Sequence, residues 1–292
     1  QMEEDLSRRG LRKARTIAAV VRLLDLAKLR VGNEHYATTN KSFGATTLRR
    51  RHVDLNGRSL TLRYRAKSGK DQQLSITDSR LLRFVRAVQD LPGQHLFQYL
   101  DEDGEAHPIS SSDVNAYIAQ AMGGDFTAKH FRTWGASTIA FETLAAGHVS
   151  LKEMIEPVAA ALGNTPTISR KSYIHPALID LCKDGQDEWR QGLRLPRRTR
   201  YLSRHERGLI AFLDDLARLI DGLADASPLQ AGEEDEEDIE DEDENDDEDE
   251  DNPDPLRIGR YLVSPGGASE SCTIFCARVD SALAGGVHGL AT

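Results

Sequence analysis

The hydrophobic period of the chain changes between residues 46 and 77, and this change constrains the fold more than any other feature. Residues 11–29, before it, carry apolar side chains at three- to four-residue spacing, which is typical of a helix with one buried face. Within residues 46–77, three segments alternate apolar and polar residues, namely 46–55, 59–66 and 72–77. Asn56-Gly57 favours a two-residue hairpin turn between the first two. We therefore expect an α+β, mainly α-helical fold with a small three-stranded antiparallel sheet.

Helical periodicity returns after the sheet, over residues 79–90, 111–121, 129–146, 151–162, 166–183 and 204–224. Thr165-Pro166 predicts a helix start, because a hydroxyl N-cap is followed by proline at the first helical position. Tyr173 is then expected about two turns into that helix, since ~3.6 residues make a turn. Serines are the expected N-caps of two other helices, at Ser111 or Ser112 and at Ser150.

The net charge of −10 conceals a basic body. Residues 233–254 hold 18 of the 47 acidic residues and no basic one, which leaves 29 acidic against 37 basic residues elsewhere. A basic surface indicates a polyanionic partner, most often nucleic acid, although charged helices that are merely solvated give the same balance. Like charges so dense disfavour packing, so we expect residues 1–226 as one domain, 227–255 as a disordered acidic linker and 256–292 as a low-complexity tail.

Composition and motifs exclude several classes of site. Three scattered cysteines provide no disulfide framework and predict a reducing compartment, and Cys272-x-x-x-Cys276 lacks the second ligand pair of a zinc site. The sequence contains no stretch of about 18 apolar residues, so it predicts no membrane span. The body contains no evident carboxylate cluster for Mg²⁺ and no nucleotide-binding Gly-x-x-x-x-Gly-Lys-Ser/Thr loop. We therefore expect a soluble, intracellular protein without a cofactor or a metal site.

Three positions carry candidate chemistry. Tyr173 follows Arg170 and Lys171, and a tyrosine hydroxyl held near a phosphate by cations is a possible nucleophile, whereas most helical tyrosines simply pack. Lys70 is expected near the tip of the second hairpin, where a lysine can also serve solubility alone. Arg132 is expected in the first turn of its helix, where a cation opposes the helix dipole, so another use is indicated. Stacking on Trp134 or pairing with a carboxylate remains an alternative.

Five short motifs occur in a fixed order along the chain. They are Leu29-Arg30-Val31-Gly32-Asn33-Glu34, Gly44-Ala45-Thr46-Thr47-Leu48 with His52-Val53, Ser68-Gly69-Lys70-Asp71, Phe131-Arg132-Thr133-Trp134-Gly135, and Leu162-Gly163-Asn164-Thr165-Pro166 with Ser169-Arg170-Lys171-Ser172-Tyr173. In these motifs the chain resembles the type IB DNA topoisomerases, most of all the small bacterial and poxvirus-like enzymes, over roughly residues 10–224. The resemblance implies the helical catalytic core that these enzymes share with tyrosine recombinases. We expect most of the family's smaller N-terminal domain to be absent.

The resemblance also implies roles for individual residues. Tyr173 would attack a DNA phosphodiester to form a 3′-phosphotyrosyl bond, and the 5′-hydroxyl would later reseal the nick without ATP or metal. Arg30 and Arg132 would clamp the phosphate, and Lys70 would protonate the departing 5′ oxygen. Asn164 stands where many relatives have histidine, and its amide can still donate one hydrogen bond. The DNA backbone would be bound by cationic side chains, namely Lys129, Arg170, Lys171, Arg49, Arg50 and Arg51.

Further expectations and two alternatives accompany this interpretation. We expect a monomer that acts on double-stranded DNA in the cytoplasm, at the bacterial nucleoid, and not at a membrane. A tyrosine recombinase would share the nucleophile and the arginines, but recombinases usually carry His-x-x-Arg where this chain has Lys129-x-x-Arg132. A non-catalytic DNA-binding protein, with the acidic run binding basic partners, is the second alternative.

Overall fold

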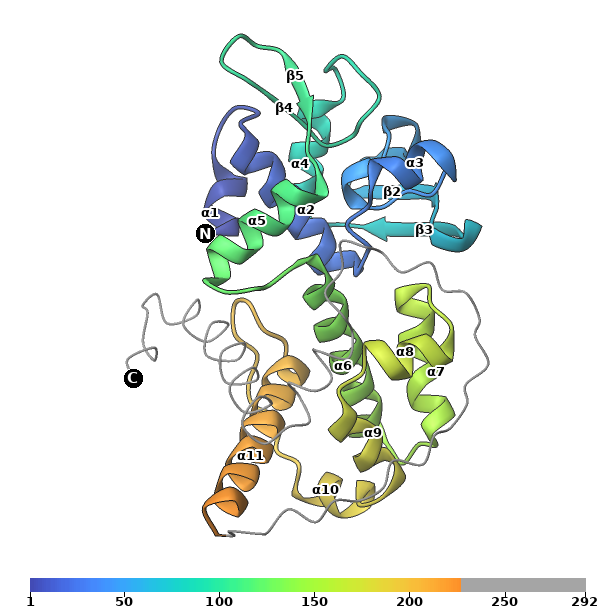
Figure 1. Cartoon of the computed structure of the whole chain (residues 1–292), viewed down its shortest axis with the longest axis vertical. Helices are drawn as coiled ribbons and strands as arrows, with labels where there is room; N and C mark the ends of the chain where they lie inside the picture. Colours follow the sequence, from blue (N-terminus) through green and yellow to red (C-terminus); the bar gives the residue numbers. More distant parts are fainter. Residues whose placement is uncertain (227–292) are drawn as a thin grey trace, which may run out of the picture. The chain divides into compact units, whose positions relative to one another are not determined.

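The computed structural model describes residues 1–226, in which helices predominate (Figure 1). The predicted acidic linker, 227–255, and the predicted tail, 256–292, lie outside the described residues. The domain boundaries expected from the sequence therefore remain predictions. Among the described helices, none is both long and apolar enough to cross a bilayer.

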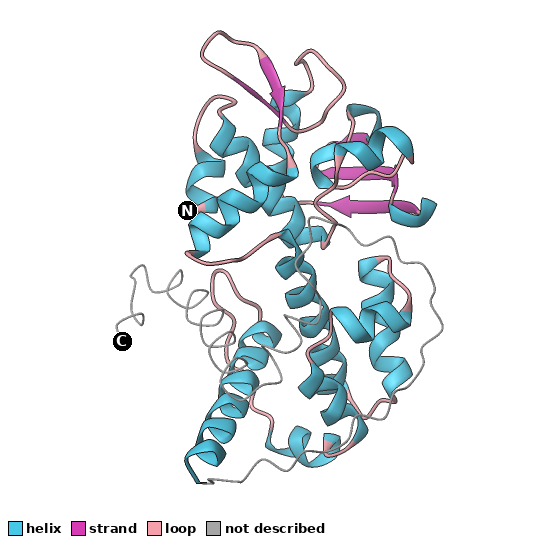
Figure 2. Ribbon diagram, viewed as in Figure 1, coloured by secondary structure: helices cyan, strands magenta, loops and turns pink. Residues whose placement is uncertain are grey.

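Two compact units divide this part of the chain. The first comprises Gln1–Ile174 and Cys182–Gln186, and the second comprises His175–Leu181 and the chain from Asp187 onward. The described strands all belong to the first unit (Figure 2). The helices up to the unit boundary are α1 (Met2–Ser7), α2 (Lys13–Ala27), α3 (Glu34–Thr39), α4 (Ser79–Val88), α5 (Ser111–Met122), α6 (Ala128–Ala146), α7 (Leu151–Leu162) and α8 (Pro166–Ser172). They are followed by α9 (Pro176–Lys183), α10 (Gln186–Gly192) and α11 (Arg204–Ala226).

Helix α2 supplies much of the core of the first unit. The apolar stripe expected on residues 11–29 is confirmed, because its members are buried, namely Ile17, Val20, Val21, Leu24 and Leu29. The helix contacts α1, α4, α5 and α6. Since α2 is so enclosed, the residues that directly follow its C-terminus start from a fixed position, and Arg30 is one of them.

The predicted three-stranded antiparallel sheet is confirmed, with the order β1 (Val53–Asn56), β2 (Ser59–Arg65) and β3 (Asp71–Ile76). Leu62 pairs with Val53 on one side and with Leu74 on the other. The turn of the first hairpin lies one residue later than predicted, at Gly57-Arg58, because Asn56 still pairs with Ser59. Gly57 has a φ of +53° and Arg58 has no positive φ, which fits a turn that needs glycine at its first central position.

The prediction of a strand over residues 46–55 is wrong for most of that segment. Two 3₁₀ turns, η1 (Ala45–Thr47) and η2 (Arg50–His52), precede β1. The reason is local and long-range hydrogen bonding: Gly44 N–H donates to Thr47 Oγ1 at 2.9 Å, and the Thr46 hydroxyl donates to the Val31 carbonyl at 3.0 Å. Such bonds compete with a strand ladder, which alternation of apolar residues cannot reveal.

The prediction of one helix over residues 166–183 is also wrong. Helix α8 ends at Ser172 and α9 begins at Pro176, with Tyr173 as the C-cap of α8 rather than a residue inside a helix. Pro176 has no N–H for a continuing helix and disfavours helical geometry in the residue before it, so the chain breaks there. The Thr165 cap is confirmed, because its side chain accepts a bond from Ile168 N–H at 3.3 Å.

The remaining helix boundaries follow the sequence with small corrections. Ser150 caps α7 as predicted, whereas Ser110, rather than Ser111 or Ser112, caps α5. Arg132 is the fifth residue of α6 and lies in its second turn, one turn later than expected. Short elements were not predicted, since few residues carry their period: these are α1, α3, α10 and the hairpin of β4 (Gln98–Leu100) and β5 (Ala106–Pro108).

Candidate active site

The position of Arg30 is set by the segment that leaves α2. Lys28 caps the helix in the left-handed conformation, with a φ of 54°, and its N–H donates to the Leu24 carbonyl at 2.9 Å. The Arg30 carbonyl then accepts from Ala45 N–H at 2.9 Å. The backbone of Arg30 is therefore held from both sides, by the end of α2 and by η1.

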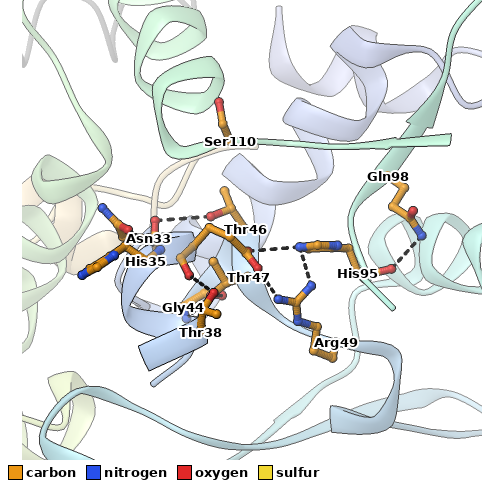
Figure 3. A network of polar contacts seen from close by, with 12 residues as sticks. Asn33, His35, Thr38, Gly44, Thr46, Thr47, Arg49, His95, Gln98 and Ser110 are labelled. Atoms are coloured by element: carbon orange, nitrogen blue, oxygen red, sulfur yellow. Dashed lines mark hydrogen bonds and ion pairs between the residues drawn. The ribbon is translucent and has the colours of Figure 1, made fainter. Parts of the chain in front are cut away.

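Two glycines allow this segment to lie against η1. A Cβ atom on Gly44 would stand 2.5 Å from the Gly32 Cα atom and 2.7 Å from the Arg30 carbonyl oxygen. Neither neighbour can yield easily, because both are backbone atoms. Figure 3 shows Gly44 beside Thr47, in a polar network in which Arg49 contacts His95. Gly32 of the first motif and Gly44 of the second thus allow the close approach that fixes the backbone of Arg30.

Arg132 is buried, with 3% of its surface exposed, and it donates hydrogen bonds to three residues in two segments of the chain. Its Nη1 donates to the Lys28 carbonyl at 2.5 Å, and its Nη2 donates to the Leu162 carbonyl at 3.1 Å and to Asn164 Oδ1 at 3.2 Å. Its Cζ lies 5.0 Å from the centroid of the Tyr173 ring. The Nε atom is buried and has no hydrogen-bond partner among the described residues. Arg132 therefore retains a donor for an anion.

Asn164 joins the two arginines. Its Oδ1 accepts from Arg30 Nη2 at 2.8 Å as well as from Arg132. Gly163, just before it, has a φ of +67° and caps α7, so the chain turns sharply into the Asn164 position. Because both arginines donate to Oδ1, the amide orientation that leaves Nδ2 as the remaining donor is fixed. Nδ2 is buried and has no partner in the described part of the chain.

Tyr173 and Tyr64 are two buried phenols near the same arginines, but their acidities differ. Burial raises the pKa of Tyr173, while the charges of Arg132, Arg30 and Lys129 lower it, and the net result is a lowered pKa. Burial raises the pKa of Tyr64 to about 12, and the same two arginines offset that only in part. Tyr173 is therefore the phenol of this pair whose ionised form the site favours.

Lys70 approaches the site from the second hairpin. It follows the turn η3 (Lys67–Gly69), is exposed, and donates from Nζ to the Gly163 carbonyl at 3.4 Å. The structure thus connects four of the predicted catalytic residues by direct contacts, namely Arg30, Arg132, Asn164 and Tyr173, and places Lys70 at Gly163, next to Asn164 in the chain. A cavity of about 30 Å³ adjoins this group, with a lining that includes Arg30, Tyr64, Gln72, Arg132 and Gly163.

Sequence reasoning missed Tyr64 and the Lys28 carbonyl. Tyr64 lies on β2 in an alternating pattern that is equally typical of a core residue, so no signal separated it from its neighbours. The Lys28 carbonyl is a backbone group, and only its left-handed cap aims it at Arg132. No sequence pattern predicts a left-handed conformation at a lysine.

The predicted DNA-binding cations differ in what they contact. Arg170 and Lys171 are exposed in the last turn of α8, and Lys129 is half-buried on α6. Arg49 instead bonds to Glu34 and His95 (Figure 3), and Arg50 donates to the carbonyls of loop 89–93. Arg51 is exposed, with its Cζ 5.9 Å from the centroid of the Phe43 ring. A DNA contact from Arg49 or Arg50 would first break these internal bonds.

The expectation that the body lacks a carboxylate cluster is wrong at one place. Asp101, Glu105 and His107 bring ligand atoms within 4.8 Å of one another on the β4–β5 hairpin. His107 Nε2 lies 2.6 Å from Asp101 Oδ2, and Asp101 Oδ1 accepts from the N–H groups of Asp103 and Glu105. The turn and the ion pair account for this arrangement, and none of the three residues lines the cavity beside Arg132.

Comparisons with known proteins identify the family of this chain. Residues 1–189 match the family model described as the catalytic core of eukaryotic DNA topoisomerase I. The chain is also 30% identical over 191 residues to DNA topoisomerase 1B of Acanthamoeba polyphaga mimivirus. That alignment covers 60% of this chain and 57% of the viral protein, so the chain spans little more than half of the relative's length. The relative is viral, and it gives no support to the expected bacterial origin. The chain belongs to the type IB DNA topoisomerase family.

Proposed function

We propose that this protein relaxes supercoiled DNA by cutting one strand transiently with Tyr173. The phenolic oxygen forms a bond to the phosphorus of a phosphodiester, and the bond from phosphorus to the 5′ oxygen breaks. The product is a 3′-phosphotyrosyl ester and a free 5′-hydroxyl. The observation that carries the proposal is the contact of Tyr173 with Arg132, which converges with Arg30 on Asn164.

The main catalytic contribution of the site would be stabilisation of negative charge on the phosphate. Phosphoryl transfer spreads negative charge over the nonbridging oxygens, and preorganised donors in a buried site stabilise that charge strongly. Two guanidiniums remain charged at any physiological pH and match a phosphate in planar, bidentate fashion. Arg132 Nε and Asn164 Nδ2 are buried donors without a partner among the described residues, which supports their use on such an anion.

Proton transfer assigns different tasks to Tyr173 and Lys70. Tyr173 must lose its proton to attack, and the lowered pKa of its phenol supports this role. The departing 5′ oxygen must gain a proton, and Lys70 is an exposed cation whose Nζ donates to the Gly163 carbonyl, one residue before Asn164. Resealing reverses both transfers. The ester conserves the energy of the broken bond, so the cycle needs no ATP.

Duplex binding would rest on the exposed cations around the site. Lys129, Arg170, Lys171 and Arg51 would bind phosphates, which positions the duplex and carries little base information. All five proposed catalytic residues come from one chain, so one copy suffices for cleavage. We therefore propose that a monomer acts on double-stranded DNA.

A covalent adduct tests the nucleophile directly. A duplex labelled at the 5′ end of the cut strand should remain attached to the protein after denaturation, and Tyr173→Phe should form no adduct while still binding DNA. Absence of any adduct would favour a non-catalytic DNA-binding protein. Adducts that form only on paired specific sites, followed by strand exchange, would favour the tyrosine recombinase alternative.

A further inference from the structure

The second unit carries a dense group of arginines that the proposed cleavage chemistry does not use. We call residues 193–207, between α10 and the first turn of α11, the arginine loop. It contains six arginines and one acidic residue, Glu206. The exposed members are Arg194, Arg197, Arg198, Arg200 and Arg204.

Internal bonds give this loop a defined shape. Thr199 N–H donates to the Leu202 carbonyl at 2.9 Å, and Leu202 N–H donates to Thr199 Oγ1 at 3.1 Å, while the Leu202 side chain is buried. Arg207 Nη1 donates to the Arg197 carbonyl at 2.7 Å, and Arg204 donates to the Pro196 carbonyl at 3.4 Å. The guanidiniums of Arg197 and Arg198 thus project from a turn that is tied to α11.

In the part of the chain that the structure describes, three exposed arginines of the loop have no acidic partner. Glu206, its acidic residue, accepts from Ser203 N–H at 2.7 Å as part of the start of α11. Within the described residues, Arg194, Arg197 and Arg198 form no ion pair, and Arg194 bonds only to the backbone carbonyls of Gln191 and Leu193. Like charges this close repel one another, and a polyanion would relieve that repulsion.

The loop also presents an aromatic face. Tyr201 is 44% exposed, and the Cζ atom of Arg200 lies 5.1 Å from the centroid of its ring. Arginine forks match phosphates, and an exposed ring can pack against a sugar of the backbone. Resting on the proposed function, we propose that the arginine loop is a second DNA-binding surface that holds the phosphate backbone of the duplex.

The acidic run of this chain, residues 233–254, is the competing occupant. Helix α11 is 23 residues long, which is about 35 Å at 1.5 Å per residue, and the 28 residues 227–254 are long enough to return along it. Two features favour DNA over this run. The run contains no aromatic residue and a single aliphatic one, Ile239, so it offers nothing to the exposed ring of Tyr201. The backbone of a duplex offers both phosphates for the arginines and sugar faces for the ring.

The salt dependence of duplex binding tests the proposal. The full chain carrying Tyr173→Phe is titrated with a duplex of about 30 base pairs across a series of salt concentrations, so that binding is measured without cleavage. The slope of log K against log salt is negative, and each phosphate contact adds about 0.9 to its magnitude. Losing three contacts therefore lowers the magnitude of the slope, which is the quantity compared below, by about 2.7. The test variant combines Arg194→Gln, Arg197→Gln and Arg198→Gln. The control combines Arg9→Gln, Arg58→Gln and Arg83→Gln, which removes the same charge from exposed positions of the first unit.

Three results decide whether the arginine loop binds DNA. A slope lowered by two or more in the loop variant, and by less than one in the control, supports the second DNA-binding surface. An unchanged slope in the loop variant overturns it. If the loop substitutions change the slope only in a full chain whose 233–254 carboxylates are converted to amides, the acidic run occupies the loop, and the proposal is wrong. The cleavage proposal is tested separately, with the three loop substitutions placed in a chain that retains Tyr173. Formation of the covalent adduct by that protein shows that cleavage remains intact whatever the binding slope.

Discussion

Asn164 accepts a 2.8 Å hydrogen bond from Arg30, although 134 residues separate the two in sequence. The same Oδ1 atom accepts from Arg132, so one amide oxygen orients two guanidiniums, while the amide Nδ2 has no hydrogen-bond partner in the described part of the chain. An asparagine can therefore position both cations without adding a charge of its own.

Replacement of Asn164 should show how much its amide donor contributes to the rate of cleavage. Asn164→Ala should slow single-turnover cleavage of a duplex about 100-fold, because removing one preorganised donor to a developing charge typically costs that much. Asn164→His should stay within tenfold of the parent, since a ring N–H can replace the amide donor. Rapid-quench measurement of covalent adduct gives both rates. Equal rates in the parent and the alanine variant would show that Asn164 supplies no donor to the transition state.

The pH dependence of cleavage should follow the ionisation of Tyr173. Because the arginines lower the pKa of its phenol, the cleavage rate should rise with pH and level off below about 10, the ordinary tyrosine value. Arg30→Gln removes one of these charges, so its plateau should move to higher pH. Arg83→Gln, at an exposed position outside the proposed DNA contacts, is the control for general loss of charge. A plateau that stays in place in Arg30→Gln would contradict electrostatic activation of the nucleophile.

Gly44→Ala should destabilise the first unit by about 1–3 kcal/mol, as overpacking of a close backbone contact does. The new methyl group would meet Gly32 Cα at 2.5 Å and displace the segment that holds Arg30. Gly147→Ala is a matched control, because nothing lies within 4 Å of its added Cβ. The midpoint of urea unfolding should therefore be lower for Gly44→Ala than for Gly147→Ala. Equal midpoints would mean that the 30–32 segment can move without loss.

His52 should make the fold sensitive to mild acid. Burial and the charges of Arg51 and Arg49 lower its pKa to about 4, and its Nδ1 accepts a bond from Arg49 N–H. Unfolded histidine has a pKa near ~6.5, so between these values the unfolded state binds more protons. Stability is therefore full above about pH 6.5 and falls as the pH drops toward 4, by on the order of 3 kcal/mol from this residue.

Unfolding by urea at several pH values measures this loss. His52→Gln should flatten the dependence between pH 4 and 6.5, although buried His175, whose pKa burial also lowers to about 4, contributes a slope of its own. His35→Gln, at an exposed position, should leave the slope as in the parent. If His52→Gln and His35→Gln behave alike, His52 carries no such linkage.

The sequence predicted well what neighbouring residues decide. Helix α7 begins and ends where its period and the Ser150 cap indicated, and the three-stranded sheet followed from alternation. Pro176 is a local signal for the break between α8 and α9. The apolar period across 166–183 nevertheless led to the prediction of one continuous helix. Local chemistry was thus sufficient for most helix boundaries and for the hairpins that carry strong turn residues.

Long-range contacts explain what could not be predicted. The 45–52 segment leaves the strand conformation because its partners are the carbonyls of Arg30 and Val31, which no local pattern reveals. The five site positions came from the order of short family motifs, whereas the roles of Arg49 and Arg50 depend on Glu34, His95 and loop 89–93, which only the fold brings together.

Relaxation of supercoiled plasmid in EDTA and without ATP tests the central claim most directly. We predict that the full chain relaxes both positively and negatively supercoiled DNA, that Tyr173→Phe does not, and that Tyr64→Phe stays within tenfold of the parent. Tyr64 is the matched control, because it is a buried phenol beside the same arginines whose pKa is raised rather than lowered. Relaxation by Tyr173→Phe, or loss of relaxation only in Tyr64→Phe, would contradict the assignment of Tyr173 as the nucleophile.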